Sequence, residues 1–207
     1  MSTELWLTFI IASLPVHFSP GPNNVLAFSR SLTHGYKAAH LASLGRYPAY
    51  LLIFLAAGSG LSLLLAASPV AFASLKWGGA LYLAWAGYRL LRSAGTEMGI
   101  GKGPRREPLS LYQFMRAEFL VAIMNPKAIL FATAFYAQFV TPGQAGFARQ
   151  FAQMVAVSLT LEWIAAGCFC LLGAGMAGAA QRTGLLAWIT RGLGAILVGF
   201  GLLLAAS

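Results

Sequence analysis

Apolar residues along the chain gather into long runs separated by short polar stretches. A helix that crosses a bilayer needs about 20 mostly apolar residues, and six runs meet this length. They are residues 5–28, 41–66, 70–91, 115–140, 148–176 and 185–206. The pattern therefore predicts an all-α integral membrane protein with six transmembrane helices. A count of five stays open if the broken first run, or the stretch 41–91, crosses differently.

The first run is interrupted by Pro20, Gly21 and Pro22, and Asn23 and Asn24 follow at once. A proline removes a backbone hydrogen-bond donor and clashes with the preceding helical turn. In lipid such a break is tolerated only where protein or a water-filled cavity satisfies the freed groups. We therefore expect this break to face the protein interior, where the two amides add hydrogen-bonding groups.

A second break stands in the fourth run, at Asn125, Pro126 and Lys127. Placing Pro22 on Pro126 aligns "GPNNVLAF" with "NPKAILFA", so that each proline is followed by apolar sequence. Further along, "KWGGAL", which begins at position 76, aligns with "RGLGAI", which begins at position 191. Matched breaks in two halves of a chain are typical of transporters built from inverted repeats.

Three runs lie on each side of the one sizeable polar stretch, "SAGTEMGIGKGPRREPLS". We therefore expect a single transmembrane domain, 1–207, whose halves 1–92 and 114–207 are joined by a cytoplasmic loop at 93–113. With three spans each, the halves must have opposite orientations. The half-helices that begin at the breaks are expected to offer positive amino ends and free N–H groups to an anion such as a carboxylate.

Composition agrees with a membrane location, because 58% of the residues are hydrophobic, 9% are charged and Asp is absent. Soluble domains average about a quarter charged residues, so a soluble enzyme or binding domain is disfavoured. Lys and Arg concentrate between runs one and two, three and four, and five and six, with Arg30 and Lys37 assigned to the first of these loops. The positive-inside rule places this side in the cytoplasm and both termini outside. The net charge of +9 follows from this asymmetry and predicts no nucleic-acid partner.

Two of the charged residues, Lys127 and Glu162, lie well inside their runs with apolar sequence on both sides, where burial in lipid is costly. Lys127 is a candidate for contact with a substrate carboxylate or an intramembrane acid, and the alternative is a lysine that reaches toward the cytoplasmic interface. Glu162 is a candidate for proton coupling or a cation site. Its alternative is a static ion pair with Lys127 or Arg46.

Two further ionisable residues receive structural interpretations. Glu118 lies near the cytoplasmic edge of the fourth run, and we expect it to pair with Arg116 or another local cation. His17 lies just before the first break and could titrate near neutral pH. For this histidine the sequence favours a hydrogen-bonded packing role.

Three motifs in this order resemble the LysE/RhtB family of amino-acid exporters. They are "SPGPNN" after the first run, "LKWGGALYLAWAGYRLLRS" at the end of the third and "NPKAILFATAFYAQFV" in the fourth. The resemblance covers essentially the whole chain. It implies efflux of amino acids across the bacterial inner membrane, with the proton gradient as the driving force of an antiporter. The family's motifs fall on Pro20–Asn23 and on Asn125–Lys127, and its fifth-span acid falls on Glu162.

The chain departs from the family pattern at two places. Where members often read F-L-P-Q-F, this sequence has "FYAQF" at 135–139, so one proline kink is expected to be missing. The second run adds Arg46, Tyr47 and Pro48 beside the expected cavity, which puts inherited specificity in doubt. The candidate substrate site therefore comprises Pro20, Gly21, Pro22, Asn23, Asn24, Tyr47, Asn125, Pro126 and Lys127, with Glu162 as the proton-coupling candidate.

Two other classes remain open at this stage. An ion or metal transporter, or a carrier of another small metabolite, would use a similar fold, although no cluster of acids and histidines predicts a metal site. A membrane enzyme would need a nucleophile and a base together, and the sequence predicts neither this nor a cofactor. Membrane lipid and a small-molecule substrate are the expected partners, and the sequence permits a homodimer without specifying it.

Overall fold

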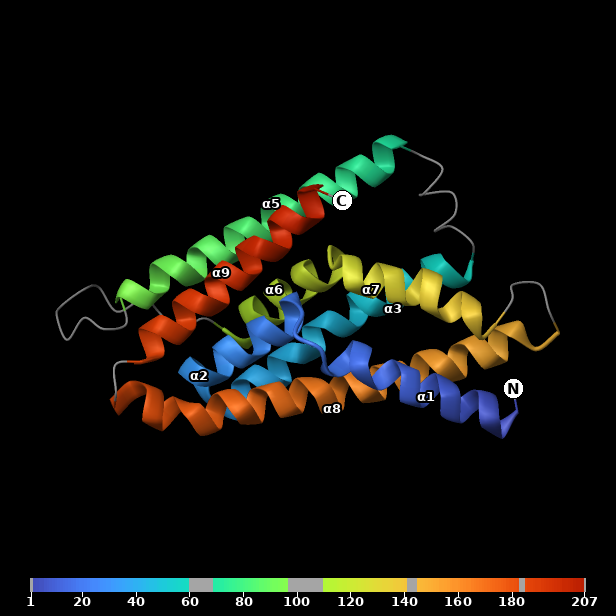
Figure 1. The fold of residues 1–207 in the computed structure, drawn as a ribbon, viewed down its shortest axis with the longest axis horizontal. Coiled ribbons are helices and arrows are strands. Elements are labelled where there is room, and N and C mark those ends of the chain that lie inside the picture. The colour runs from blue at the N-terminus through green and yellow to red at the C-terminus, as the bar shows by residue number, and fades with distance from the viewer. Residues whose placement is uncertain (1, 60–68, 97–109, 141–144, 183–184, 207) are drawn as a thin grey trace.

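The computed structural model describes residues 2–59, 69–96, 110–140, 145–182 and 185–206. These residues are almost wholly helical and contain no strand (Figure 1). The all-helical fold class expected from the sequence is therefore confirmed for this part of the chain. The end of the expected second span, 60–66, and most of the expected loop 93–113 lie outside the described residues.

The helices fall into two sets that flank the expected central loop. The first set is α1 (Thr3–Phe18), α2 (Pro22–Ala42), α3 (Arg46–Gly58) and α5 (Pro69–Thr96). The second set is α6 (Leu111–Ile123), α7 (Pro126–Leu130), α8 (Phe147–Arg182) and α9 (Leu185–Ala206). A 3-10 turn at Ser43–Gly45 joins α2 to α3, and a π-helical turn at Phe131–Phe135 followed by a 3-10 turn at Tyr136–Gln138 extends α7.

Helix length and hydropathy identify fewer clear spans than the sequence predicts. Within the described residues, Pro22–Gly58 and Phe147–Gly178 are long and apolar enough to cross a membrane. A third candidate is the pair Leu111–Ile123 and Lys127–Gln138, which is bent by 62° at its break. Thr3–Phe18 and Ala187–Leu203 are shorter apolar helices. The expected first span is thus divided, and its second part continues well beyond residue 28.

The first break forms where the prolines predict it. Helix α1 ends at Phe18, and α2 begins at Pro22, with Gly21 in an extended conformation as its N-cap. Proline suits the first position of a helix because its missing N–H would be unpaired there in any case. Within α2 the backbone turns sharply at Gly35, whose φ of 78° is readily adopted only by glycine.

Arg30 corrects the loop assignment made from the sequence. It is a buried residue of α2, five positions before the turn at Gly35, and it is not part of a connecting loop. Its charge is tolerated there because Nη1 lies 2.9 Å from a carboxylate oxygen of Glu118. A count of loop cations that includes Arg30 therefore overstates the positive charge available to set orientation.

The segment 135–139 is irregular despite its missing proline. The chain passes from a π-helical turn at Phe131–Phe135 to a 3-10 turn at Tyr136–Gln138. Tyr136 is buried, with its hydroxyl 3.1 Å from the Met154 carbonyl and 2.7 Å from the Ser158 hydroxyl. Its ring contacts the edges of several aromatic rings, including those of Phe9 and Phe131. Aromatic packing and a buried hydroxyl thus fix the change of helical geometry here.

Helices α5 and α9 run side by side and pack backbone to backbone (Figure 1). A Cβ added to Gly87 would lie 2.6 Å from the carbonyl oxygen of Gly194, and one added to Gly194 would lie 2.8 Å from that of Gly87. A Cβ on Gly201 would similarly lie 2.7 Å from the Ala80 carbonyl oxygen. Small residues at helix contacts let backbones approach closely in membranes, where no hydrophobic effect drives helices together.

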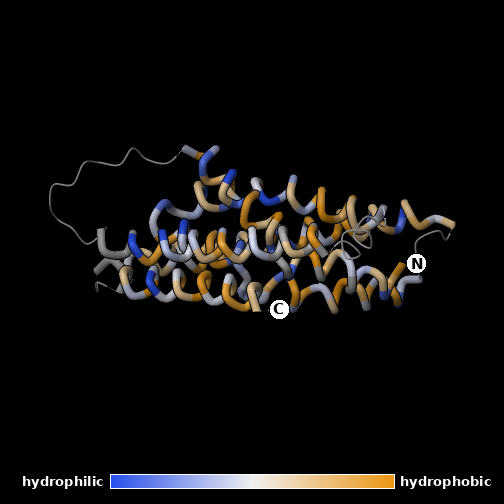
Figure 2. Tube along the Cα trace, turned by 90° about the horizontal axis from the view of Figure 1, so that it is seen from above, coloured by the Kyte–Doolittle hydropathy of each residue, from blue (hydrophilic) through white to orange (hydrophobic). Residues whose placement is uncertain are grey.

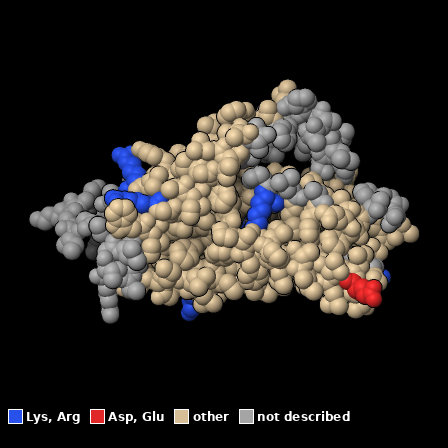
Figure 3. All heavy atoms as spheres, in the orientation of Figure 1, with Lys and Arg blue, Asp and Glu red and all other residues tan. Residues whose placement is uncertain are grey.

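The outer surface carries many large apolar side chains. Val70, Leu55, Trp188 and Leu203 are each about two thirds exposed or more, and hydrophobic residues are spread along most of the helices (Figure 2). The face seen in Figure 3 has few charged groups. Contiguous apolar surface of this kind is covered in proteins by lipid or by partners, as the predicted membrane location requires.

The close α5–α9 contact gives a prediction with a matched control. Gly87→Ala should lower the midpoint of thermal unfolding in detergent, because the new Cβ forces the helices apart at a cost of about 1–3 kcal/mol. Gly192→Ala, on the same helix pair, has no atom within 4 Å of its added Cβ. It should be neutral or stabilising by roughly 0.5–1 kcal/mol, since alanine is the better helix former. Equal midpoints for the two variants would contradict the packing described here.

Candidate functional site

A fully buried arginine connects the two sets of helices. Arg46, at the start of α3, places Nη2 at 2.8 Å from Oε2 of Glu118 on α6 and Nη1 at 2.7 Å from Oε1 of Glu162 on α8. Its side chain and that of Glu118 are wholly inaccessible to solvent. One guanidinium therefore bridges two carboxylates that come from different helices of the second half.

The hydrogen bonds of Arg46 account for all of its N–H groups. Nε donates to Oε2 of Glu118 at 3.1 Å, and Nη2 also donates to the backbone carbonyl of Asn23 at 3.1 Å. Nη1 donates to Oδ1 of Asn24 at 3.2 Å in addition to Glu162. A guanidinium has five N–H donors, and with these contacts each has an acceptor. Such saturation is what makes a buried charge tolerable.

Each carboxylate has a second cationic or ionisable partner. Nη1 of Arg30 lies 2.9 Å from Oε1 of Glu118, and Nδ1 of His17 lies 3.0 Å from Oε2 of Glu162. Among the described residues, every ion pair given by the geometry joins a base from α1–α3 to an acid from α6 or α8. The two arginines and two glutamates balance in charge, and together they tie one half of the chain to the other.

Glu118 corrects an expectation from the sequence. The sequence predicts a place near the cytoplasmic edge of its run and a partner in Arg116 or another local cation, but Arg116 is exposed and Glu118 is fully buried. Its partners are Arg30 and Arg46. For Glu162, the alternative of an ion pair with Arg46 is confirmed by the 2.7 Å contact.

The two asparagines after the first break complete this network. Nδ2 of Asn23 donates to the backbone carbonyl and Oε2 of Glu118, at 3.1 and 3.0 Å. Nδ2 of Asn24 donates to the carbonyls of His17 and Ser19, at 3.0 and 3.2 Å. The amides thus bind carbonyl oxygens that the end of α1 leaves unpaired, and they hold the break against α6. This is the physical reason for amides beside the prolines.

The two breaks lie against each other, as their shared pattern suggests. Nδ2 of Asn125 donates to Oδ1 of Asn23 at 3.1 Å, and the ammonium of Lys127 donates to the carbonyl of Ser19 at 3.2 Å. A Cβ added at Gly21 would lie 3.5 Å from both Cδ and Nζ of Lys127. The side chain of Lys127 therefore extends over the first break, and it is half-buried there.

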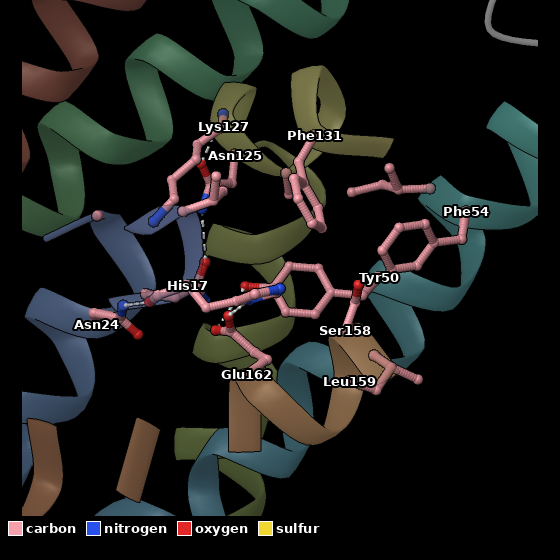
Figure 4. A pocket seen from close by; sticks show the side chains of 15 residues that line it. His17, Asn24, Tyr50, Phe54, Asn125, Lys127, Phe131, Ser158, Leu159 and Glu162 are labelled. Atoms are coloured by element: carbon pink, nitrogen blue, oxygen red, sulfur yellow. Dashed lines mark hydrogen bonds and ion pairs between the residues drawn. The ribbon is translucent and has the colours of Figure 1, made fainter. Parts of the chain in front are cut away.

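A pocket opens between the two breaks and the helices α3 and α8 (Figure 4). Its polar lining includes His17, Asn23, Asn24, Asn125, Lys127 and Glu162. Its apolar lining includes Val16, Ile53, Phe54, Phe131 and Leu159. The space open to the centres of water molecules is about 40 Å³, which is room for a few waters. A larger occupant requires the lining side chains to move.

The structure brings together most, but not all, of the candidate site residues. The candidates that line the pocket are Gly21, Asn23, Asn24, Asn125, Lys127 and Glu162. Pro22 is buried at the start of α2, Pro20 is exposed, and neither is among the lining residues. Tyr47 points elsewhere, since its hydroxyl donates to the Leu159 carbonyl at 3.0 Å. Pro126 begins α7 beside the pocket, and its side chain is outside the described atoms.

Several residues that line the pocket are not among the candidate site residues from the sequence. The hydrogen-bonded packing role expected for His17 is confirmed by its burial and its contact with Glu162, and the structure adds that His17 lines the pocket. The sequence does carry a sign that His17 belongs to the site, because His17 is an isolated ionisable side chain in an apolar run next to a break. Tyr50, whose hydroxyl donates to Oε1 of Glu162 at 3.2 Å, and Phe131 gave no such signal. Aromatic residues are too common in these runs to be singled out.

The bridging role of Arg46 gives a second prediction. Arg46→Gln should destabilise the protein by about 3–5 kcal/mol, because it leaves buried carboxylates without their shared cation. Arg191→Gln is the control, since Arg191 is exposed and only stacks on Trp188, with its guanidinium carbon 5.4 Å from the ring centre. Thermal unfolding in detergent measures both. An Arg46→Gln protein as stable as the Arg191→Gln protein would show that the network is not a structural necessity.

Comparison with known proteins agrees with the resemblance carried by the sequence motifs. The family model described as LysE type translocator matches residues 14–207. An uncharacterized membrane protein of Pseudomonas aeruginosa is 32% identical over 99% of this chain and 96% of its own length. A leucine efflux protein of Klebsiella pneumoniae is 30% identical, covering 81% of this chain and 75% of the relative.

A homoserine/homoserine lactone efflux protein of Salmonella typhi is 31% identical, covering 72% of this chain and 71% of the relative. No solved structure matches the chain. The apolar helices and the membrane-protein relatives identify a multi-pass membrane protein. The chain belongs to the LysE family of translocators.

Proposed function

We propose that this protein is a secondary active exporter that moves amino acids or amino-acid derivatives out of the bacterial cytoplasm, driven by the proton gradient. The observation that carries the proposal is the pocket between the two helix breaks, lined by Lys127 and Glu162 on its polar side (Figure 4). An amino acid carries one carboxylate and one ammonium group close together. A site with separate cationic and electron-rich groups suits such a zwitterion.

The carboxylate end of the substrate fits the region around Lys127. Three hydrogens of a lysine ammonium can donate, and the contact with the Ser19 carbonyl uses one of them. The 21-residue helix α2 begins beside it, and its N-cap Gly21 supplies no capping side chain. The positive amino end of a helix and a lysine both favour a bound carboxylate. At the start of the short α7, in contrast, the backbone N–H of Lys127 already donates to Oδ1 of Asn125 at 3.1 Å. The amino end of α7 therefore contributes less to binding of the carboxylate than that of α2.

The relatives and the apolar wall support the substrate class. Leucine and homoserine, named for two of the relatives, share the amino-acid head group and differ in the side chain. The wall formed by Phe54, Phe131 and Leu159 suits an aliphatic side chain. We therefore take leucine as the first substrate to be tried.

The contacts between α5 and α9 support the proposed inverted repeat and, with it, a rocking mechanism. A shift of 114 residues carries Gly87 onto Gly201 and Ala80 onto Gly194, within one residue of the register expected from sequence. A Cβ added to Gly87 would lie 2.6 Å from the Gly194 carbonyl oxygen. Under this shift the equivalent contact is that of a Cβ added to Gly201, which would lie 2.7 Å from the Ala80 carbonyl oxygen. Equivalent contacts exchanged in this way are what a two-fold axis between α5 and α9 would produce. Six spans and alternating access by movement of the two halves follow in this proposal.

Most of the exposed cations among the described residues support the predicted orientation, with Arg149 at the start of α8 as the exception. Lys37 is exposed near the end of α2, Arg89 and Arg92 near the end of α5, and Arg191 near the start of α9. These three helix ends lie toward the same end of the molecule (Figure 1). The N-terminus and the start of α8 lie at the other end. The positive-inside rule places the first end in the cytoplasm of the cell and the N-terminus outside.

The function is tested by efflux from cells that express the protein and are fed a panel of dipeptides. Leucine or related amino acids should accumulate outside the cells over time. Lys127→Ala should reduce that accumulation by about tenfold or more, because a charge-assisted contact to the carboxylate contributes about 1.5–3 kcal/mol. Lys37→Ala, which removes an exposed lysine, is the matched control and should export normally.

Immunodetection of each variant in the membrane fraction separates lost transport from lost protein. Among the described residues the ammonium of Lys127 makes a single hydrogen bond, to the Ser19 carbonyl, so its variant should reach normal levels. No external accumulation of any amino acid with the protein in place would refute the exporter function. Equal export by the lysine variants would refute only the role of Lys127.

A further inference from the structure

One nitrogen in the pocket has no partner. His17 is 6% exposed and lines the pocket, and its Nε2 is buried without any hydrogen-bond partner. Its other nitrogen is held by Glu162 at 3.0 Å. A buried polar atom that lacks a partner carries a desolvation cost, and at a binding pocket this cost is removed when a ligand supplies the partner.

The surroundings of His17 fix which nitrogen carries hydrogen. Glu162 accepts from Arg46 at 2.7 Å and from Tyr50 at 3.2 Å, both through Oε1, which is the environment of an ionised carboxylate. An ionised carboxylate only accepts hydrogen bonds, so Nδ1 of His17 must donate to Oε2. In the neutral ring, Nε2 then presents a lone pair to the pocket, and in the protonated ring it presents an N–H.

We propose that Nε2 of His17 binds the ammonium group of the transported amino acid and, in the alternate step of the cycle, binds the transported proton. The inference rests on the proposed exporter function. The lone pair of the neutral ring accepts a hydrogen bond from the ammonium while Lys127 holds the carboxylate. A protonated ring has no acceptor and repels the ammonium, so one nitrogen cannot hold both.

The groups that face His17 from the neighbouring helices favour this assignment. From α8, Glu162 holds Nδ1; from α3, Arg46 and Tyr50 contact the other oxygen of that carboxylate. From α7, Lys127 lines the same pocket, and on the far side of Arg46 lies Glu118 of α6. The charges of Glu162, Arg46, Glu118 and Arg30 balance among themselves. The unpartnered Nε2 of His17 is therefore the atom that can take up or release a proton without breaking one of these ion pairs.

The packing of His17 against Phe131 also suits a binding role for Nε2. Figure 4 shows its side chain with Glu162 below and Phe131 above, reaching toward Tyr50. The Phe131 ring meets the imidazole edge to face, with centres 5.0 Å apart. Packing on one side and the Glu162 hydrogen bond on the other hold the ring in place. A fixed ring keeps Nε2 directed at the pocket, which lowers the ordering cost of binding.

Each transport cycle exchanges one proton for one amino acid at Nε2 of His17. Facing the cytoplasm, protonated His17 releases the proton from Nε2 to water, and the ammonium of an amino acid then donates to the freed lone pair. After the site opens to the outside, the amino acid leaves and a proton from that side binds Nε2. One proton enters for each zwitterion exported, so each cycle carries one positive charge inward.

Binding of labelled leucine to the purified protein at several values from about pH 5.5 to about pH 8 tests the proposal. Leucine remains a zwitterion throughout this range. The wild-type affinity should weaken toward acid pH, by up to about tenfold per pH unit, because a proton and the leucine ammonium compete for the same nitrogen. His17→Gln keeps a polar group but cannot titrate, so its affinity should be flat over the range. His34→Gln is the control, because His34 is exposed, and it should keep the wild-type slope.

A second readout uses only the wild-type protein and so does not depend on how the variant folds. Leucine added to weakly buffered protein at about pH 6, near the ordinary titration of histidine, should release protons that a pH indicator detects. Absence of release, or a His17→Gln slope equal to that of the wild type, would overturn the role of His17 and leave the exporter function intact. Failure of the wild-type protein to bind or export any amino acid would instead refute the proposed function itself.

Discussion

The architecture depends on the bond between the Arg46 guanidinium and the carboxylates of Glu118 and Glu162. A charge in the interior of a membrane protein costs several kcal/mol unless it is paired and hydrogen-bonded. Here the five N–H groups of Arg46 all find acceptors, and two of those acceptors are supplied by the asparagines that follow the first break. The break, the amides and the ion pairs therefore form a single structural unit.

This unit also determines where a substrate could bind. The Arg46 guanidinium occupies the space between the carboxylates of Glu118 and Glu162, where a bound cation would otherwise be attracted. Lys127 and one nitrogen of His17 are left facing the pocket. The ion pairs join bases of the first half to acids of the second. In the proposed rocking mechanism, movement of the halves must either keep these pairs intact or exchange them for others, which would link the conformation of the protein to its buried charges.

The sequence was sufficient where local chemistry decides the structure. Proline and glycine at 20–22 and proline at 126 predicted both breaks, and the apolar runs predicted a helical membrane protein, because these effects act within one turn or one span. It was insufficient where partners are distant. Arg46 meets Glu118 and Glu162 at 72 and 116 positions away, and His17 meets Glu162 at 145. A residue's neighbours in one run cannot reveal such contacts, which is why the sequence places Arg30 in a loop, gives Glu118 a local partner and leaves His17 out of the candidate site.

The most direct test of the account is an experimental structure of the purified protein with leucine bound. The account predicts leucine between the two breaks, with its carboxylate within hydrogen-bond distance of Nζ of Lys127 and its ammonium at Nε2 of His17. The ion pairs of Arg46 would remain beside it. Leucine bound elsewhere in the molecule, with waters alone in this pocket, would contradict the account.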